Sequence, residues 1–203
     1  MNNLFTSGGF VMWPLLIFSI TSLACILERL YYWKVIDWHN RNTLKVIIEK
    51  FLNPQNDSIK FLKRNKNYPL AKIIIRASDY RNQDSESFHL ALIYAIQSSI
   101  KGIKKFDNLF STIITTSPLL GLLGTILGLI KSFALLDLGK GDINSVGVTG
   151  GISEALISTA AGLIVAIFTL LFANYFKSQS NNHISLIQEY AAKLELLNSK
   201  KTN

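Results

Sequence analysis

The sequence predicts an all-α membrane protein with three transmembrane helices and a large helical cytoplasmic arm. Three windows of the 203-residue chain carry no charged side chain: Asn2–Leu27, Asn108–Ile130 and Ala155–Phe176, which hold 26, 23 and 22 residues. A helix needs about 20 mostly apolar residues to cross roughly 30 Å of hydrocarbon. Only a helix or a closed barrel can satisfy all backbone hydrogen bonds there. Three buried helices of a soluble protein would need a larger surrounding domain than this chain provides, so we expect three helical spans.

Six segments follow from these windows. They are an outer amino terminus with the first transmembrane helix (1–27), a cytoplasmic helical arm (28–107), a second transmembrane helix (108–131), an outer loop (132–153), a third transmembrane helix (154–176) and a cytoplasmic helical tail (177–203). The flank Met1–Gly9 has no Lys or Arg and so lacks the basic region of a secretory signal, and we expect the first span to be retained.

Charge gives the orientation of the spans. The arm from Glu28 to Asp107 holds fifteen Lys or Arg against eight carboxylates, whereas the 132–153 loop holds only Lys140, Asp137 and Asp142. Because cytoplasmic loops are enriched in Lys and Arg, we expect the arm and the tail inside and the amino terminus and the loop outside. Several cations flank span ends, where they can meet anionic lipid headgroups, so the net charge of +8 does not require a nucleic-acid partner.

The arm and the tail have the apolar spacing of amphipathic helices. Residues 44–51 form one such helix that ends at Asn53-Pro54, another begins at about Leu70, and residues 86–107 are expected to run without interruption into the second span. Residues 184–197 are expected to extend the third helix into the cytoplasm. Such long helices need neighbours, which favours an oligomer. The single cysteine and three scattered histidines have no metal-ligand spacing, so no metal or cofactor is expected.

Small and polar residues recur at helical spacing in the second and third spans. The second span carries Ser111, Thr115, Pro118, Gly121, Thr125, Gly128 and Ser132, and the third carries Ala155, Thr159, Gly162, Ala166, Thr169 and Ala173. Such faces allow close helix packing, and Gly124–Gly128 matches the GxxxG pattern. We therefore assign helix packing to five small residues: Gly121, Gly124, Gly128, Gly162 and Ala166.

Glu154 is the carboxylate at the outer start of the predicted third span. An acidic group at membrane depth is costly and points to ion handling. The alternative is that Ser153 and Glu154 cap the helix, since acidic residues in the first turn complement the helix dipole. Glu154 precedes Thr159 by five residues, about 140° round the helix, so it flanks the small face. Lys131, at the outer end of the second span, can extend its ammonium to the membrane–water interface, and we assign it no function.

Two runs then give a resemblance. Residues 117–133 read SPLLGLLGTILGLIKSF and residues 151–163 read GISEALISTAAGL; with Glu28-Arg29-Leu30 after the first span, they closely resemble the MotA/TolQ/ExbB proton-channel family, and its ExbB branch in particular. By position, Thr125 and Thr159 match the family's two pore-facing threonines, and Glu154 matches its glutamate in the third span. Lys131 departs from the neutral residue expected there.

The resemblance implies an energy transducer of the bacterial inner membrane with a periplasmic amino terminus. In this family a pentamer surrounds the single span of an ExbD- or TolR-like partner, and proton passage drives motion passed to TonB for outer-membrane import. A TolQ-like role in envelope maintenance, a passive membrane scaffold, and sodium in place of the proton remain open. A flagellar stator subunit would have four spans, and no pattern of nucleophile and base, metal cluster or phosphate loop indicates an enzyme.

Overall fold

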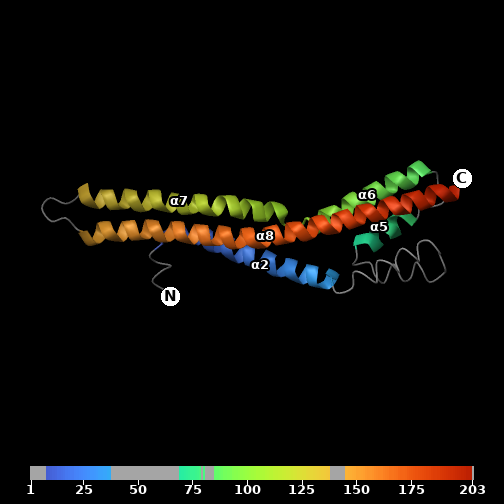
Figure 1. Ribbon diagram of the computed structural model, residues 1–203. Coiled ribbons are helices and arrows are strands. Elements are labelled where there is room, and N and C mark those ends of the chain that lie inside the picture. The colour runs from blue at the N-terminus through green and yellow to red at the C-terminus, as the bar shows by residue number, and fades with distance from the viewer. Residues whose placement is uncertain (1–7, 38–68, 79, 81–84, 138–144, 203) are drawn as a thin grey trace. The chain divides into compact units, whose positions relative to one another are not determined.

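The computed structural model describes residues 8–37, 69–78, 80, 85–137 and 145–202. These residues form helices α2 (Met12–Asp37), α5 (Pro69–Ser78), α6 (Ser85–Ile103), α7 (Asp107–Asp137) and α8 (Ser145–Thr202), with no strand among them (Figure 1). The all-α prediction is confirmed for this part of the chain. The helix expected at 44–51 and its end at Asn53-Pro54 lie outside the described residues.

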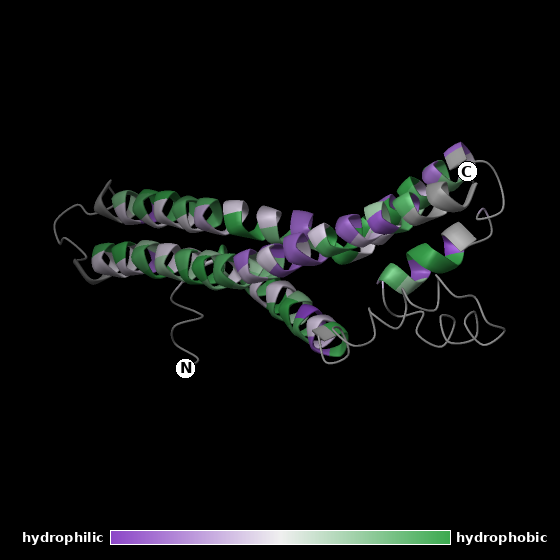
Figure 2. Cartoon of the chain, turned by 45° about the vertical axis from the view of Figure 1, so that its right-hand side comes forward, coloured by the Kyte–Doolittle hydropathy of each residue, from purple (hydrophilic) through white to green (hydrophobic). Residues whose placement is uncertain are grey.

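Three helical stretches are long and apolar enough to cross a membrane: Met12–Ile36, Glu86–Ala134 and Gly147–Leu196. Large apolar side chains such as Leu119 and Leu171 point outward, whereas Ser158 and Thr169 are fully buried. This pattern, apolar outside and polar inside, is typical of helices surrounded by lipid, where apolar surface needs no burial. Figure 2 shows predominantly hydrophobic colouring along α7 and the first part of α8. The chain is therefore a multi-pass membrane protein.

The chain folds as two compact units. The span unit combines Met1–Glu28 with Phe106–Tyr175, and the arm unit combines Arg29–Lys105 with Phe176–Asn203. Long helix α8 contributes its first part to the span unit and its last part to the arm unit, which confirms the prediction that the third helix continues through residues 184–197.

The arm unit has an apolar core built by α5, α6 and the end of α8. Helix α5 begins at Pro69, one residue before the predicted start at about Leu70. Proline suits this first helical position because the amide hydrogen that it lacks would have no partner there. The buried core side chains include Leu70, Ile73, Ile74, Phe88, Leu92, Ala95, Ile187, Ala191 and Leu194. On its edge, Arg76 of α5 donates to the hydroxyl of Ser98 on α6 at 2.6 Å.

The expectation of an uninterrupted helix over 86–107 is wrong. Helix α6 ends at Ile103 and α7 begins at Asp107, with Phe106 between them at φ +71°, a conformation that non-glycine residues rarely adopt. In a continuous helix the carbonyls of Gly102 and Ile103 would accept from the amides four residues later. Instead, the Arg29 guanidinium donates to them at 3.3 and 3.2 Å, which ends the helix.

Arg29 is itself placed differently from the sequence-based expectation of a lipid-facing flank charge. It is only 2% exposed, and its guanidinium lies 5.0 Å from the centre of the Tyr32 ring. The Ser180 hydroxyl of α8 also donates to the Ile103 carbonyl, at 3.5 Å. A buried cation at a helix carboxyl end complements the negative end of the helix dipole. Within the arm unit, Arg29 therefore ties α2 to the end of α6.

Candidate functional site

Helices α7 and α8 lie side by side and antiparallel in the span unit (Figure 1), and glycines bring their backbones close together. A Cβ on Gly121 would lie 3.0 Å from the Thr159 Cα, and one on Gly162 would lie 2.5 Å from the Ser117 carbonyl oxygen. Both distances are shorter than a van der Waals contact, and both involve backbone that cannot rotate away. These two positions therefore accept no side chain larger than hydrogen without separating the helices.

The same close approach continues toward the α7–α8 connection. A Cβ on Gly128 would lie 2.7 Å from the Gly151 carbonyl oxygen and 2.9 Å from the Ala155 Cβ, and Gly124 faces the side chain of Ser158. The small faces expected on the second and third spans thus pack on each other within one chain. Ala166, farther along α8, is 6% exposed.

Thr159 and Thr125 meet at one backbone carbonyl. The Thr159 hydroxyl crosses from α8 and donates to the Gly121 carbonyl oxygen at 3.0 Å. In the α-helical ladder that carbonyl also accepts from the amide of Thr125, four residues later. The Thr125 hydroxyl donates to the Leu122 carbonyl at 2.7 Å. Both hydroxyl protons are engaged with backbone, while both oxygens keep lone pairs that can accept from a water molecule or a side chain.

The third-span small face divides between two neighbours. Its outer half faces α7, but Thr169 is fully buried and its hydroxyl lies 2.7 Å from that of Ser22 on α2. Thr169 also donates to the Val165 carbonyl at 2.7 Å, and a hydroxyl has one proton, so Ser22 is the donor within the pair. Thr169 therefore links α8 to α2, a role that periodicity alone did not indicate.

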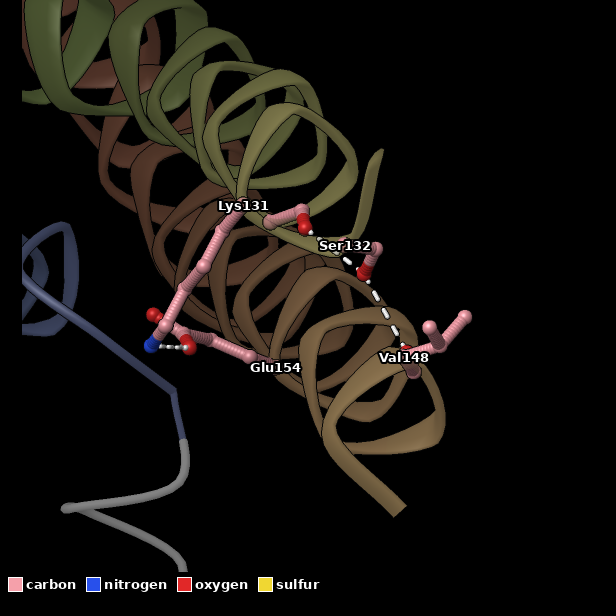
Figure 3. Close-up of polar contacts among 5 residues, drawn as sticks. Lys131, Ser132, Val148 and Glu154 are labelled. Carbon is pink, nitrogen blue, oxygen red and sulfur yellow. Dashed lines mark hydrogen bonds and ion pairs between the residues drawn. The ribbon is translucent and has the colours of Figure 1, made fainter. Parts of the chain in front are cut away.

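Glu154 lies inside a helix and not at its start. Helix α8 begins at Ser145, nine residues earlier, so the interpretation of Ser153 and Glu154 as a helix cap is wrong. The Glu154 carboxylate accepts from the Lys131 ammonium of α7, with 2.8 Å between Nζ and Oε2 (Figure 3). The Glu154 side chain is 23% exposed and that of Lys131 is 64% exposed. The carboxylate is thus the more sheltered member of the ion pair.

Beside this ion pair, Ser132 joins the two helices a second time. Its hydroxyl shares one proton between the Gly128 carbonyl of its own helix, at 3.0 Å, and the Val148 carbonyl of α8, at 3.2 Å (Figure 3). An ion pair and a cross-helix hydrogen bond on successive residues, Lys131 and Ser132, fix how α7 and α8 face each other near their connection.

Sequence reasoning missed the role of Lys131. The signal was present, because Lys131 and Glu154 are opposite charges at neighbouring ends of two spans joined by the 132–153 loop. In a helical hairpin, residues at similar distances from the connection lie opposite each other. The interpretation as an isolated cation extending to the interface considered the helix alone and not its neighbour.

The chain is similar in sequence to known membrane proteins. Residues 60–189 match the model of the MotA/TolQ/ExbB proton channel family. The chain is 45% identical over 192 residues to the putative biopolymer transport protein ExbB-like 3 of Synechocystis sp., covering 94% of this chain and 91% of that protein. It is 30% identical to the putative biopolymer transport protein ExbB-like 1 of the same organism, and the match covers 95% of this chain and 77% of that protein. It is 34% identical to the biopolymer transport protein ExbB of Neisseria gonorrhoeae, and that match covers 68% of this chain and 64% of that protein.

Proposed function

This chain belongs to the MotA/TolQ/ExbB proton channel family, and from that premise we propose that it is the ExbB-like subunit of a proton-driven motor in a bacterial inner membrane. The motor couples proton passage to mechanical work on a TonB-like protein that serves outer-membrane import. A proton that crosses 100 mV releases about 2.3 kcal/mol, and the protein contributes a path and a moving part, with no covalent catalysis.

The observation that carries the proposal is the meeting of Thr159 and Thr125 at the Gly121 carbonyl. A cross-helix hydrogen bond holds the Thr159 hydroxyl on the Gly121 carbonyl, and a bond within α7 holds the Thr125 hydroxyl on the Leu122 carbonyl; both oxygens can accept hydrogen bonds from water without any fixed charge. Glu154 is one and a half turns nearer the α7–α8 connection on the same helix, and it adds a carboxylate that can take up and release a proton. We assign the pathway to these three residues.

Partners and placement belong to the same proposal. Several copies of the chain, five in our proposal, surround the single span of an ExbD- or TolR-like protein, with lipid on the outer side. The exposed apolar side chains of α7 and α8 give both surfaces that such an assembly needs, one toward the next copy and one toward lipid. The arm and the tail lie in the cytoplasm and the amino terminus in the periplasm, because of the charge distribution of the sequence.

A passive membrane scaffold is the second candidate, and the glycine contacts favour it. Close packing of Gly121 and Gly162 on α8 and α7 explains the small faces without any transport. The two candidates differ in what they require of the Thr159 hydroxyl. Packing needs its volume, whereas a proton path needs its oxygen.

The test replaces Thr159 with valine, which keeps the volume and removes the hydroxyl. The chain is co-reconstituted in proteoliposomes with an ExbD-like single-span protein, and proton influx under a potassium diffusion potential is followed with an internal pH-sensitive dye. We expect Thr159→Val and Glu154→Gln to lower influx at least tenfold while the complex stays assembled. Thr112→Val is the matched control, because the exposed Thr112 hydroxyl bonds only its own helix, at Asn108. Unchanged influx in Thr159→Val and Glu154→Gln would overturn the motor and leave the scaffold.

A further inference from the structure

We propose that Lys131 is a positioning residue that holds the Glu154 carboxylate against the amino-terminal turn at residues 9–12, and that the pathway works only with this ion pair in place. The requirement of the pathway for this ion pair rests on the proposed function, whereas the positioning of the carboxylate does not. Lys131 comes from α7, Glu154 from α8 and the turn precedes α2, so the three segments of the span unit meet at one carboxylate.

The first argument is the geometry of the ion pair. The 2.8 Å separation of Lys131 Nζ and Glu154 Oε2 is that of a charge-assisted hydrogen bond. The partly exposed Lys131 chain reaches across to a carboxylate that is three-quarters covered. A long flexible side chain that bends toward a more sheltered anion restricts the positions of that anion, and the two side chains meet beside the helix pair (Figure 3).

The second argument is independent and comes from Gly9. A Cβ built on Gly9 would collide with Oε1, the carboxylate oxygen that Lys131 does not bind, and Gly9 has φ +71°. Glycine adopts that conformation at no steric cost. One carboxylate oxygen thus faces the ammonium and the other fills the space left by a missing side chain. The carboxylate sits in a fitted position and not at an open surface.

The turn is anchored on the same helix pair. The Met12 amide donates to the Gly9 carbonyl at 3.2 Å, and Val11 is 3% exposed and lies beside Gly124 of α7. Because Val11 is fixed on α7 and Gly9 leaves room for the Glu154 carboxylate on α8, the turn cannot shift without disturbing both. This arrangement defines where the carboxylate can be, and Lys131 is the residue that keeps it there.

Magnitude decides between this inference and a simpler explanation. An ion pair in free contact with water contributes little, and many such pairs contribute nothing measurable. Removing one partner of a sheltered pair leaves the other charge uncompensated, with a much larger effect. Loss of the Lys131 charge should therefore have little effect if the pair is a simple surface ion pair and a large effect if Lys131 positions Glu154.

The experiment is a double-mutant cycle with two readouts, thermal unfolding of the chain in lipid nanodiscs and proton influx in the reconstituted complex. We expect Lys131→Met, which keeps the apolar stem, to lower the melting temperature and to reduce influx at least tenfold. Lys131→Arg should bring influx to within about threefold of the wild-type value and the melting temperature to within a few degrees of it, because arginine keeps a cation at the same reach. Lys131→Met combined with Glu154→Gln should be more stable than Lys131→Met alone and conduct no less than Glu154→Gln alone.

Gly9→Ala provides a second route to the same carboxylate from the other side. We expect it to lower influx at least tenfold, since its Cβ takes the space of Oε1. Gly150→Ala is the matched control: Gly150 is one turn from Glu154 on α8, and a Cβ there meets nothing within 4 Å. Equal influx in Gly9→Ala and Gly150→Ala would contradict the fitted position.

The outcomes separate this inference from the proposed function. The positioning role would be overturned if Lys131→Met had wild-type stability and influx. It would also be overturned if the effects of Lys131→Met and Glu154→Gln on stability and influx were independent of each other. Either result would count even if Thr159→Val abolishes influx. Conversely, coupled losses of stability with no effect of Glu154→Gln or Thr159→Val on influx would overturn the motor and the pathway requirement, while the Lys131–Glu154–Gly9 arrangement stands.

Discussion

Gly162→Ala probes the contact that holds the candidate pathway together. Its new Cβ would lie 2.5 Å from the Ser117 carbonyl oxygen and 3.2 Å from the Gly121 Cα. Ordinary separations between a carbon and a carbonyl oxygen are about 3.3 Å or more, so α7 and α8 must separate by roughly 0.8 Å at this level. Both neighbours are backbone atoms, so no rotamer change relieves the collision.

The energetic outcome is the sum of two opposing effects. Overpacking a close contact costs typically about 1–3 kcal/mol. Alanine has a higher helix propensity than glycine, which stabilises the helix by about 1 kcal/mol. We expect the free energy of unfolding to fall by about 0–2 kcal/mol, and proton influx to fall more steeply. The steeper fall follows because Thr159, three residues away, bonds across the same gap at 3.0 Å and loses its acceptor when the gap widens.

Equilibrium unfolding in mixed micelles and proton influx in proteoliposomes measure the two quantities. Gly150→Ala is the control for helix propensity, because its Cβ meets open space, and it should be neutral or slightly stabilising. A Gly162→Ala variant that is as stable as Gly150→Ala would refute the reasoning, since it would show that α7 and α8 are not in backbone contact at this level.

Three further predictions use the same unfolding assay. Arg29→Gln should destabilise the chain by about 1.5–3 kcal/mol, the range for hydrogen bonds to a charged group, and Arg29→Lys should recover only part of this because one ammonium cannot reproduce the guanidinium fork. Thr169→Val should cost about 0.6 kcal/mol, with at most about 1.7, and adding Ser22→Ala should cost nothing further. Gly151→Ala should destabilise where Gly150→Ala does not, because only Gly151 faces Ser132, and equal stability of these adjacent variants would contradict the packing.

The three spans were predictable because the absence of charge is a local property of the sequence. The tail extension of α8 and, to within one residue, the start of α5 at Pro69 were predictable for the same reason, since periodicity and a proline act within a few residues. By contrast, the end of α6 depends on Arg29, more than seventy residues earlier in the chain. No window around residues 100–107 contains that information.

The start of α8 shows a second limit. Charge placed the beginning of the third span at Glu154, and the glycines at 147, 150 and 151 before it have low helix propensity. The helix nevertheless begins at Ser145. Gly151 explains why, since its missing side chain lets the Gly128 carbonyl and the Ser132 hydroxyl approach. Tertiary contact there outweighs the low helix propensity of glycine.

The residues proposed for the candidate site came from the sequence, but their arrangement could not be predicted from it. Helical spacing brought Thr125, Thr159 and the glycines onto two faces, and resemblance singled out Glu154. Which face meets which neighbour depends on the antiparallel pairing of α7 with α8. That pairing supplies the Gly121 carbonyl for Thr159 and the Lys131 ammonium for Glu154.

In the proposed motor, close packing and proton handling use the same small faces. Without a side chain at Gly121, α8 approaches closely enough for the Thr159 hydroxyl to reach the carbonyl beneath Thr125. The same approach, continued at Gly128, places Lys131 opposite Glu154. A polar group in lipid must have a partner, and here the glycines supply it by letting backbone carbonyls and a cation come within reach. In the proposed motor the packing holds the polar path together, so a mutation that loosens it should weaken proton passage before it unfolds the chain.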